Sequence, residues 1–310
     1  MERIIIVFTC DENYVRHTAT VIASILQNSS RAFRFYIFDC GISPESLQKL
    51  QTWELGDQEL IVVPMQKNDL FERYTIPSWY SHAIFYRLMI PDRVPEHDKV
   101  LYLDSDVIVC SDIGELWDID LGDRLIGGVD EAVFFSGRWY EKRKKINGFP
   151  EDRIYFNSGV LLMNTKALRE WNFFEKIVRV LQERTDLHFP DQDALNFLFE
   201  NSQRLCFDCR YNFLLPLNVK KSLQSVSPVI VHLIMKPWNL PVHLLPKRLF
   251  FTKYAKKYFE CIQRTPFASQ MTKEVSYRIL AKVFWKLTFQ PIETFVRMKI
   301  RDPFLARWKR

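Results

Sequence analysis

Two aspartates one residue apart, Asp104 and Asp106, lie within the apolar run Val100-Leu-Tyr-Leu-Asp-Ser-Asp-Val-Ile-Val109. In an extended chain, side chains at positions i and i+2 point to the same side. At the end of a strand, two such carboxylates can share one hard divalent cation, which in turn binds phosphate oxygens. The pattern therefore predicts a metal site for a substrate that carries phosphate.

The acidic pair alone also fits other interpretations. A strand that runs into an acidic turn needs no metal, although burying two aspartates beside apolar residues costs free energy unless something compensates. An apolar strand followed by D-x-D-x-[TV] is also typical of haloacid-dehalogenase phosphatases, in which Asp104 would be the nucleophile. The rest of the chain has to discriminate between these alternatives.

Strands and helices are expected to alternate over the first hundred residues. Apolar runs predict strands at 4–9, 33–39, 59–63 and 100–103, and helical spacing predicts helices at 15–27, after Ser43-Pro44 and at 80–89. This alternation is typical of a doubly wound, mostly parallel α/β sheet, in which ligands bind at the carboxyl ends of the strands. The loop after the first strand is therefore expected to meet the acidic pair.

The remainder of the chain continues the α/β pattern. Strands are expected at 125–129, 159–163 and 229–233, and helices at 170–184 and 191–200.

With 310 residues, 47% of them hydrophobic, the chain suits one large domain or a domain with an appendage. The N-terminus resembles a first strand rather than a signal peptide, and the six cysteines are scattered, which favours a cytoplasmic location. Cys206 and Cys209 form the one close pair; two buried thiols are favoured there over a zinc site.

Charge divides the chain into two parts. Residues 247–310 contain 16 Lys and Arg against 4 Asp and Glu, a net charge of +12, which leaves −6 on residues 1–246 because the whole chain carries +6. The basic part also contains large apolar side chains, namely Phe284, Trp285, Phe289, Phe295, Phe304 and Trp308. This mixture favours a helical tail that binds an anionic membrane surface. A solvated helix face and nucleic-acid binding are the alternatives, and no accompanying motif supports nucleic acid.

Several motifs, in order, resemble those of the family 8 retaining glycosyltransferases, and among them the bacterial lipopolysaccharide galactosyl- and glucosyltransferases. The resemblance covers residues 3–240. Its motifs are Asp11-x-Asn13-Tyr14, Tyr86-Arg87-Leu88, Leu101-Tyr-Leu-Asp-Ser-Asp106, Phe156-Asn-Ser-Gly-Val160, Asp191-Gln192-Asp193 and His232…Lys236-Pro-Trp238. The resemblance implies a GT-A type fold with a catalytic domain at residues 1–246, and it favours a transferase over a phosphatase.

The resemblance also implies a role for each matching residue. A Mn²⁺ or Mg²⁺ ion would be bound by Asp104, Asp106 and His232, and imidazole suits Mn²⁺ better. Gln192 would lie nearest the anomeric carbon as a positioner and charge stabiliser, with Asp191 on a hydroxyl of the transferred sugar. The donor would be bound by Thr9, Asp11, Asn13, Tyr14, Arg87, Asp104, Ser105, Asn157, Ser158 and Lys236.

The expected reaction is transfer of galactose or glucose from a UDP-sugar to a glycan, with retention at the anomeric carbon. The acceptor is expected to be a lipid-linked core glycan, which would place the enzyme on the inner membrane face. One segment departs from the family: the apolar stretch between His232 and Lys236 is shorter than usual. The alternatives are a D-x-D phosphohydrolase and a degenerate protein that binds UDP without turnover.

Overall fold

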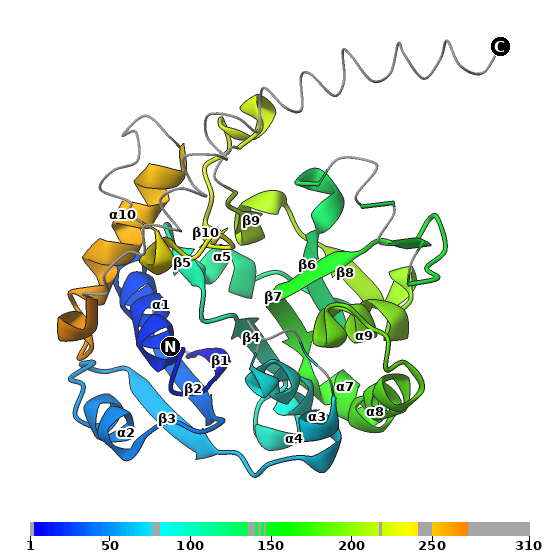
Figure 1. The fold of residues 1–310 in the computed structure, drawn as a ribbon, viewed down its shortest axis with the longest axis horizontal. Coiled ribbons are helices and arrows are strands. Elements are labelled where there is room, and N and C mark those ends of the chain that lie inside the picture. Colours follow the sequence, from blue (N-terminus) through cyan, green and yellow to red (C-terminus); the bar gives the residue numbers. More distant parts are fainter. Residues whose placement is uncertain are drawn as a thin grey trace.

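In the part of the chain that the structure describes, seven strands form the main sheet, in the order β3-β2-β1-β4-β7-β6-β8 (Figure 1). The computed structural model describes residues 3–74, 76, 81–135, 140–141, 144–145, 147–216, 219–240 and 250–271. The strands of this sheet are β1 (Ile4–Cys10), β2 (Phe33–Asp39), β3 (Glu59–Pro64), β4 (Lys99–Leu103), β6 (Ile126–Asp130), β7 (Phe156–Asn164) and β8 (Arg204–Cys206).

The predicted α/β fold with a mostly parallel sheet is confirmed. β1 pairs in parallel with both β2 and β4, and β2 pairs in parallel with β3. β7 is antiparallel to its neighbours β4 and β6, while β8 is parallel to β6. The carboxyl ends of β1 and β4 therefore meet at one edge of the sheet, where a ligand is expected.

A second sheet of three short strands was not predicted as a sheet. It consists of β5 (Val107–Val109), β10 (Ile230–His232) and β9 (Phe213–Leu214), in the order β5-β10-β9. Because β4 ends at Leu103 and β5 begins at Val107, the acidic pair lies in the link between the two sheets. His232 is the register partner of Val107, so the antiparallel pairing of β10 with β5 brings the histidine to the same link.

Helices cover the sheet, and their ends follow local chemistry. The helices are α1 (Val15–Asn28), α2 (Pro44–Gln51), α3 (Asp69–Arg73), α4 (Ile90–Arg93), α5 (Gly114–Trp117), α7 (Thr165–Glu170), α8 (Phe173–Glu183), α9 (Pro190–Leu198) and α10 (Phe250–Ile262), with 3₁₀ helices that include η1 (His82–Met89). Ser43 caps α2 as predicted: its hydroxyl accepts the Ser46 N–H at 3.2 Å, and Pro44 stands in the first turn.

Two predicted helices differ in detail. The helix expected at 170–184 is α8, which begins three residues later at Phe173, because Asn172 adopts the left-handed conformation with φ of 55° between α7 and α8. Asn tolerates this conformation better than most residues. The helix expected at 80–89 is the 3₁₀ helix η1, which continues into α4; Pro91 lies in the first turn of α4, where its missing N–H has no helical partner to lose.

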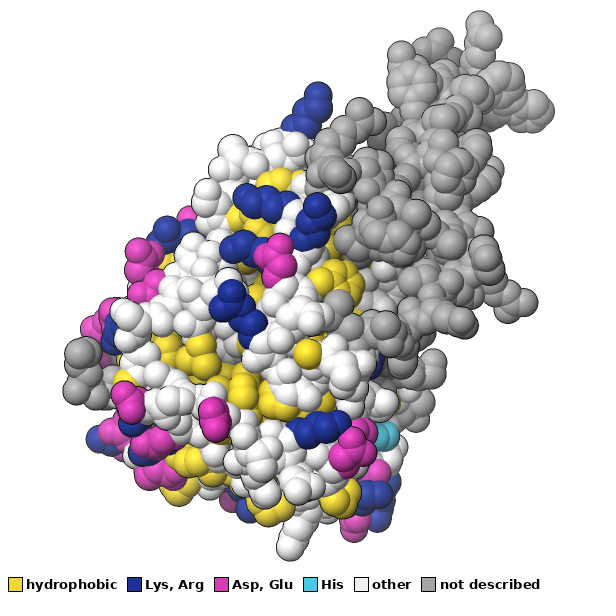
Figure 2. Space-filling model, turned by 90° about the vertical axis from the view of Figure 1, so that its left-hand side faces the viewer, with side chains coloured by type: hydrophobic (Ala, Val, Ile, Leu, Met, Phe, Trp, Pro, Cys, Tyr) yellow, Lys and Arg dark blue, Asp and Glu magenta, His cyan; other side chains and the backbone are white. Residues whose placement is uncertain are grey.

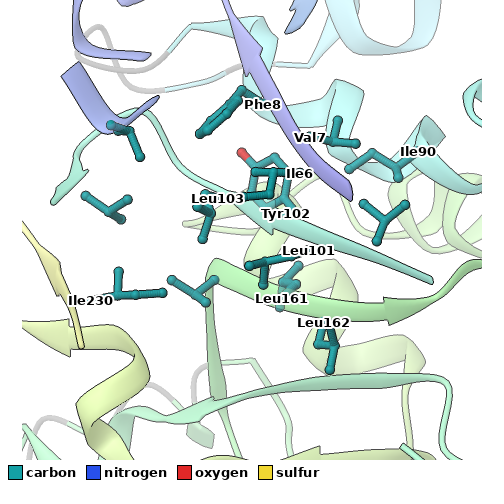
Figure 3. Close-up of a cluster of buried hydrophobic side chains, with 14 of the residues drawn as sticks. Ile6, Val7, Phe8, Ile90, Leu101, Tyr102, Leu103, Leu161, Leu162 and Ile230 are labelled. Carbon is teal, nitrogen blue, oxygen red and sulfur yellow. The ribbon is translucent and has the colours of Figure 1, made fainter. Parts of the chain in front are cut away.

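The core joins the two sheets. Figure 3 shows Ile6 and Phe8 of β1, Leu101 and Leu103 of β4, Leu161 of β7 and Ile230 of β10 in one cluster of buried side chains. Apolar side chains from both sheets are thus removed from water together, which is the main free-energy gain that fixes their relative position. The link that carries Asp104 and Asp106 is consequently anchored at both of its ends.

Helix α10, the last α-helix of the described residues, packs along α1 (Figure 1). Its aromatic side chains Phe251, Tyr254 and Tyr258 are buried in the core. The first part of the predicted tail is therefore packed on the body of the protein. The predicted boundary at 246/247 and the apolar residues from Phe284 onward lie outside the described residues. Within the described part of the chain, no helix is both long enough and apolar enough to cross a bilayer.

Candidate active site

A cavity of about 740 Å³ opens at the carboxyl ends of β1 and β4. This volume is in the usual range for small-molecule sites. Thirteen of the predicted site residues line it: Thr9, Asp11, Tyr14, Arg87, Asp104, Ser105, Asp106, Asn157, Ser158, Asp191, Gln192, His232 and Lys236. Asn13 does not line the cavity; it is exposed, and its backbone N–H donates to Oδ1 of Asp11 at 3.0 Å.

Asp104, Asp106 and His232 form a candidate metal site. One ligand atom from each residue lies within 4.8 Å of the others. Nε2 of His232 is 3.3 Å from Oδ1 of Asp106 and 4.0 Å from Oδ2 of Asp104. The Nδ1–H of His232 donates to Oδ1 of Asn212 at 3.1 Å, which directs Nε2 toward the two carboxylates. A histidine whose second nitrogen is held in this way is typical of metal ligands, so the residues present fit a divalent cation.

Gly159 lies directly behind this cluster. Its carbonyl accepts the Asp104 N–H at 2.8 Å, and a Cβ added to Gly159 would be 2.5 Å from Cε1 of His232 and 2.8 Å from Oδ2 of Asp104. Real Cβ atoms do not approach so closely. The glycine of the Asn-Ser-Gly motif therefore leaves space that the His232 and Asp104 side chains occupy. Strand β7 thereby positions the metal site as well as Asn157 and Ser158.

Lys236 reaches the cluster despite the shortened segment before it. Its ammonium donates to Oδ2 of Asp106, and its backbone adopts φ of 47°. Burial alone would raise the pKa of Asp106, but Lys236 and His232 outweigh burial and hold that pKa far below its usual range. Burial alone would lower the pKa of His232; the Asp106 carboxylate outweighs it and raises that pKa above its ordinary value.

The loop after β1 forms another wall of the cavity. Tyr14 and Asp11 lie on it, and Nζ of Lys236 is 5.3 Å from the centroid of the Tyr14 ring. The hydroxyls of Ser105 and Thr18 are hydrogen-bonded at 2.8 Å, which ties the start of α1 to the link between the sheets. The expected meeting of this loop with the acidic pair is therefore present in the structure.

Arg87 connects the metal cluster to the Asp191–Gln192 segment. Its guanidinium is 2.9 Å from Oδ1 of Asp104, 3.2 Å from Oδ2 of Asp191 and 2.9 Å from the Ser158 carbonyl. The side chain is 5% exposed, so these partners compensate a buried charge. Burial raises the pKa of Asp191, and Arg87 opposes that rise.

The amide of Gln192 is held on both sides. Its Oε1 accepts the Asn157 side-chain N–H and the Ser158 backbone N–H, each at 3.0 Å. Its Nε2 donates to Oε1 of Glu131 at 2.9 Å and to the Tyr155 hydroxyl at 3.1 Å. These four bonds fix both the position and the orientation of the amide. They also leave Oε1 with no free lone pair for attack on a substrate.

Three residues that orient the site side chains by hydrogen bonds were not predicted from the sequence. Glu131 also accepts from Asn157 at 3.0 Å, Tyr102 donates to Oδ1 of Asp104 at 2.6 Å, and the side-chain amide of Asn212 donates to Oδ1 of Asn157 at 2.8 Å. Tyr102 lies inside the acidic motif. Because successive side chains of a strand point to opposite faces, Tyr102 points away from the side of Leu101 and Leu103, and this alternation could have identified it from the sequence. Glu131 lies in η2 (Glu131–Val133) and Asn212 in η4 (Cys209–Asn212), and no motif or spacing in the sequence marks either residue.

The fold and this site together define a class of protein. A mostly parallel α/β sheet that places an Asp-Asp-His cluster in a cavity at its strand ends is characteristic of GT-A type glycosyltransferases. Among solved structures, the chain is similar to the galactosyltransferase LgtC in complex with donor and acceptor sugar analogs, with a TM-score of 0.70 and 26% identity. The similarity covers 90% of this chain and all of that one (100%).

Residues 5–240 match the profile of glycosyl transferase family 8, and the chain belongs to that family. It is 29% identical to general stress protein A of Bacillus subtilis over 254 residues, which cover 76% of this chain and 87% of that protein. It is 28% identical to the lipopolysaccharide glucosyltransferase WaaO of Escherichia coli, over 76% of this chain and 72% of that one. The predicted family and its relation to lipopolysaccharide glycosyltransferases are confirmed, and membership decides against the phosphohydrolase alternative.

Proposed function

We propose that the protein is a metal-dependent, retaining hexosyltransferase that moves galactose or glucose from a UDP-sugar to a glycan hydroxyl. The observation that supports this most is that the Asp104–Asp106–His232 cluster and the Asp191–Gln192 segment share one cavity and are joined by Arg87. A donor with its diphosphate at the cluster would have its sugar beside Gln192.

The nucleotide end of the donor would lie against the loop after β1. The Tyr14 ring would stack on the uracil face, and the Asp11 carboxylate would accept the uracil N3–H, with Asn13 holding Asp11 in place. The hydroxyls of Thr9 and Ser105 lie on the same wall and would bind the donor there. This assignment makes Tyr14 the main contributor to recognition of the base.

The diphosphate would lie between the metal cluster and Lys236. A Mn²⁺ or Mg²⁺ ion bound by Asp104, Asp106 and His232 would supply Lewis-acid stabilisation of the departing diphosphate. Lys236 would turn from Asp106 to the phosphate oxygens, which its flexible stem allows. Arg87 would keep the Asp104 carboxylate oriented during the reaction, since its guanidinium is 2.9 Å from Oδ1 of that carboxylate.

The chemistry would proceed on one face of the sugar. Because Oε1 of Gln192 already accepts two N–H groups, Gln192 acts as a positioner and charge stabiliser rather than a nucleophile. The acceptor oxygen bonds to the anomeric carbon as the bond to the UDP oxygen breaks, and the acceptor proton passes to the leaving phosphate. The oxocarbenium-like transition state is stabilised by the Gln192 amide oxygen, and Asp191 and Asn157 bind the sugar hydroxyls.

The acceptor and the location of the enzyme are inferred from a relative and from the charge of the surface. The relative WaaO is a lipopolysaccharide glucosyltransferase, which supports a lipid-linked core glycan as the acceptor. On the face that carries α10, Lys and Arg side chains gather (Figure 2), and Lys253, Lys256 and Arg264 are exposed there. This basic surface, together with the excess of Lys and Arg in the sequence of residues 272–310, would hold the enzyme on the anionic inner face of the cytoplasmic membrane.

The proposal is tested by incubating the protein with UDP-galactose, UDP-glucose and UDP-N-acetylglucosamine, with Mn²⁺ or with a chelator, with a truncated lipopolysaccharide core as acceptor. The expected result is Mn²⁺-dependent UDP release from one hexose donor and an α-linked product from the α-linked donor. A β-linked product would refute retention. UDP binding without release from any donor would indicate a degenerate binding protein instead.

A further inference from the structure

Helix α10 lies outside residues 5–240, which match the family profile, yet it contacts the structure around the donor cavity. It packs along α1, and α1 begins immediately after the loop that carries Asp11 and Tyr14 (Figure 1). The side chains between α10 and this loop are therefore those that could transmit the position of α10 to the cavity wall.

A buried hydrogen bond joins the two helices. Nδ1 of His17 on α1 and the Tyr258 hydroxyl on α10 are 2.7 Å apart, and each residue is 2% exposed. Nε2 of His17 accepts from Nε of Arg16 at 3.3 Å, so the ring proton is on Nδ1 and is donated to Tyr258. Both ring nitrogens of His17 are thereby engaged, which fixes the plane of the imidazole.

The His17 ring is the centre of an aromatic cluster that reaches the cavity. It stacks on Trp238 with 3.9 Å between centroids and 25° between planes, and it meets Tyr14 edge-on at 5.5 Å. Trp238 in turn lies 5.0 Å from the Tyr258 ring. Nζ of Lys236 is 5.7 Å from the Trp238 ring, in addition to its contact with Tyr14. Two cavity residues, Tyr14 and Lys236, are thus packed against a support that α10 completes.

We propose that Tyr258 and His17 are positioning residues for the nucleotide, and that α10 is a structural part of the donor site. By holding the His17 ring, Tyr258 fixes the Tyr14 ring in the orientation that stacks on the base. A ring held in place before binding loses less conformational entropy when the nucleotide arrives. This inference rests on the proposed function, because it takes the bound nucleotide to be UDP.

The test measures the dissociation constant of UDP in the presence of Mn²⁺ for the full chain and for Tyr258→Phe. This substitution keeps the ring contact with Trp238 but removes the acceptor of the His17 proton. The expected result is UDP affinity weaker by about three- to tenfold, the entropy cost of immobilising one side chain, the Tyr14 ring, on binding. The matched control is Tyr254→Phe, the same change one turn earlier on α10, where the buried tyrosine ring meets Phe250. UDP affinity should be unchanged in the control.

A double-mutant cycle with Tyr14→Leu separates positioning from a general loss of stability. In the Tyr14→Leu background, Tyr258→Phe should change UDP affinity by less than about twofold, because its effect acts through the Tyr14 ring. An unchanged affinity in Tyr258→Phe, an equal loss in Tyr254→Phe, or a full effect in the Tyr14→Leu background would each overturn the inference while wild type still binds UDP. Failure of wild type to bind UDP would overturn the proposed function as well.

Discussion

Lys236 and Asp106 form an ion pair inside the cluster that we propose as the metal site. The lysine contacts Oδ2 of Asp106, and His232 is 3.3 Å from Oδ1, so both carboxylate oxygens face a nitrogen donor. Because His232 is itself a proposed ligand, a metal ion that binds Asp106 competes with the Lys236 ammonium for this carboxylate. The lysine has the longer and more flexible side chain, and it is the partner that we expect to move.

Replacing Lys236 by Met should have opposite effects on the metal and on the nucleotide. Without UDP, the apparent affinity for Mn²⁺ should increase by about tenfold, because the competing ammonium is removed. With Mn²⁺ present, UDP should bind more weakly, because a cation that contacts the diphosphate is lost. Electron paramagnetic resonance of free Mn²⁺ measures the first effect and calorimetry the second. Lys253→Met, on the exposed face of α10, should leave both unchanged, and weaker Mn²⁺ binding in Lys236→Met would contradict this account.

The affinity for Mn²⁺ should depend on pH through His232. The folded-state pKa of His232 is raised above its ordinary value of 6.5 by Asp106. Below that raised pKa the metal must displace a proton, so affinity should rise by up to about tenfold per pH unit and then level off above it. The stabilising charge pair of the metal-free protein is complete below 6.5 and is lost as pH rises through the folded pKa.

Titrations of Mn²⁺ between about pH 6 and pH 9 measure this dependence. His97→Gln is the control, since His97 contacts Tyr36 and Glu96 and does not line the cavity. The control should keep the wild-type pH profile. A wild-type affinity that is independent of pH over this interval would exclude His232 as a ligand.

Gly159→Ala should damage the metal site while leaving the fold intact. The added Cβ would be 2.5 Å from the His232 ring and 2.8 Å from Oδ2 of Asp104, so at least one ligand has to shift. Displaced ligands should weaken Mn²⁺ binding by about 10- to 100-fold. Gly56→Ala is the control: Gly56 has φ of 61° and no atom within 4 Å of the added Cβ, so it tests loss of stability without a clash. Equal Mn²⁺ affinity in Gly159→Ala and wild type would argue against the cluster as the metal site.

Gln192→Glu should reduce turnover strongly, and a second substitution should restore part of it. The new carboxylate would replace an amide whose nitrogen is 2.9 Å from Oε1 of Glu131, so two like charges would face each other. Combining it with Glu131→Gln exchanges the amide and the carboxylate and removes the repulsion. Thermal melting and UDP release should both recover in the double variant relative to Gln192→Glu. Additive losses in the double variant would show that Glu131 does not orient Gln192.

The elements that carry strong periodicity were predictable from sequence. The range 33–39 agrees with β2 residue for residue, the cap of α2 follows from Ser43-Pro44, and the parallel order of the first strands follows from their alternation with helices. The spaced polar motifs also identified thirteen residues that line one cavity. In these cases, the signal is local or is repeated along the chain.

The remaining features depend on contacts that no local pattern encodes. A strand was expected at 229–233, where β10 lies, but β5 has three residues, too few to show a period, and no signal in the sequence marks the pairing of the two strands that places His232 in the metal cluster. Glu131 becomes a site residue because β6 ends beside Gln192. The predicted membrane-binding tail, residues 247–310, includes α10, because composition does not distinguish a face that packs on α1 from one that packs on lipid.

The central claim is that Asp104, Asp106 and His232 hold the metal that binds a UDP-sugar, and calorimetric titration of UDP tests it most directly. The titration compares wild type with Asp106→Asn, which keeps the shape of the side chain and removes its charge, each with Mn²⁺ and with a chelator. We predict that UDP binds wild type with Mn²⁺, and that the chelator or the substitution weakens binding by at least about tenfold. Equal UDP affinity in all four titrations would contradict the account.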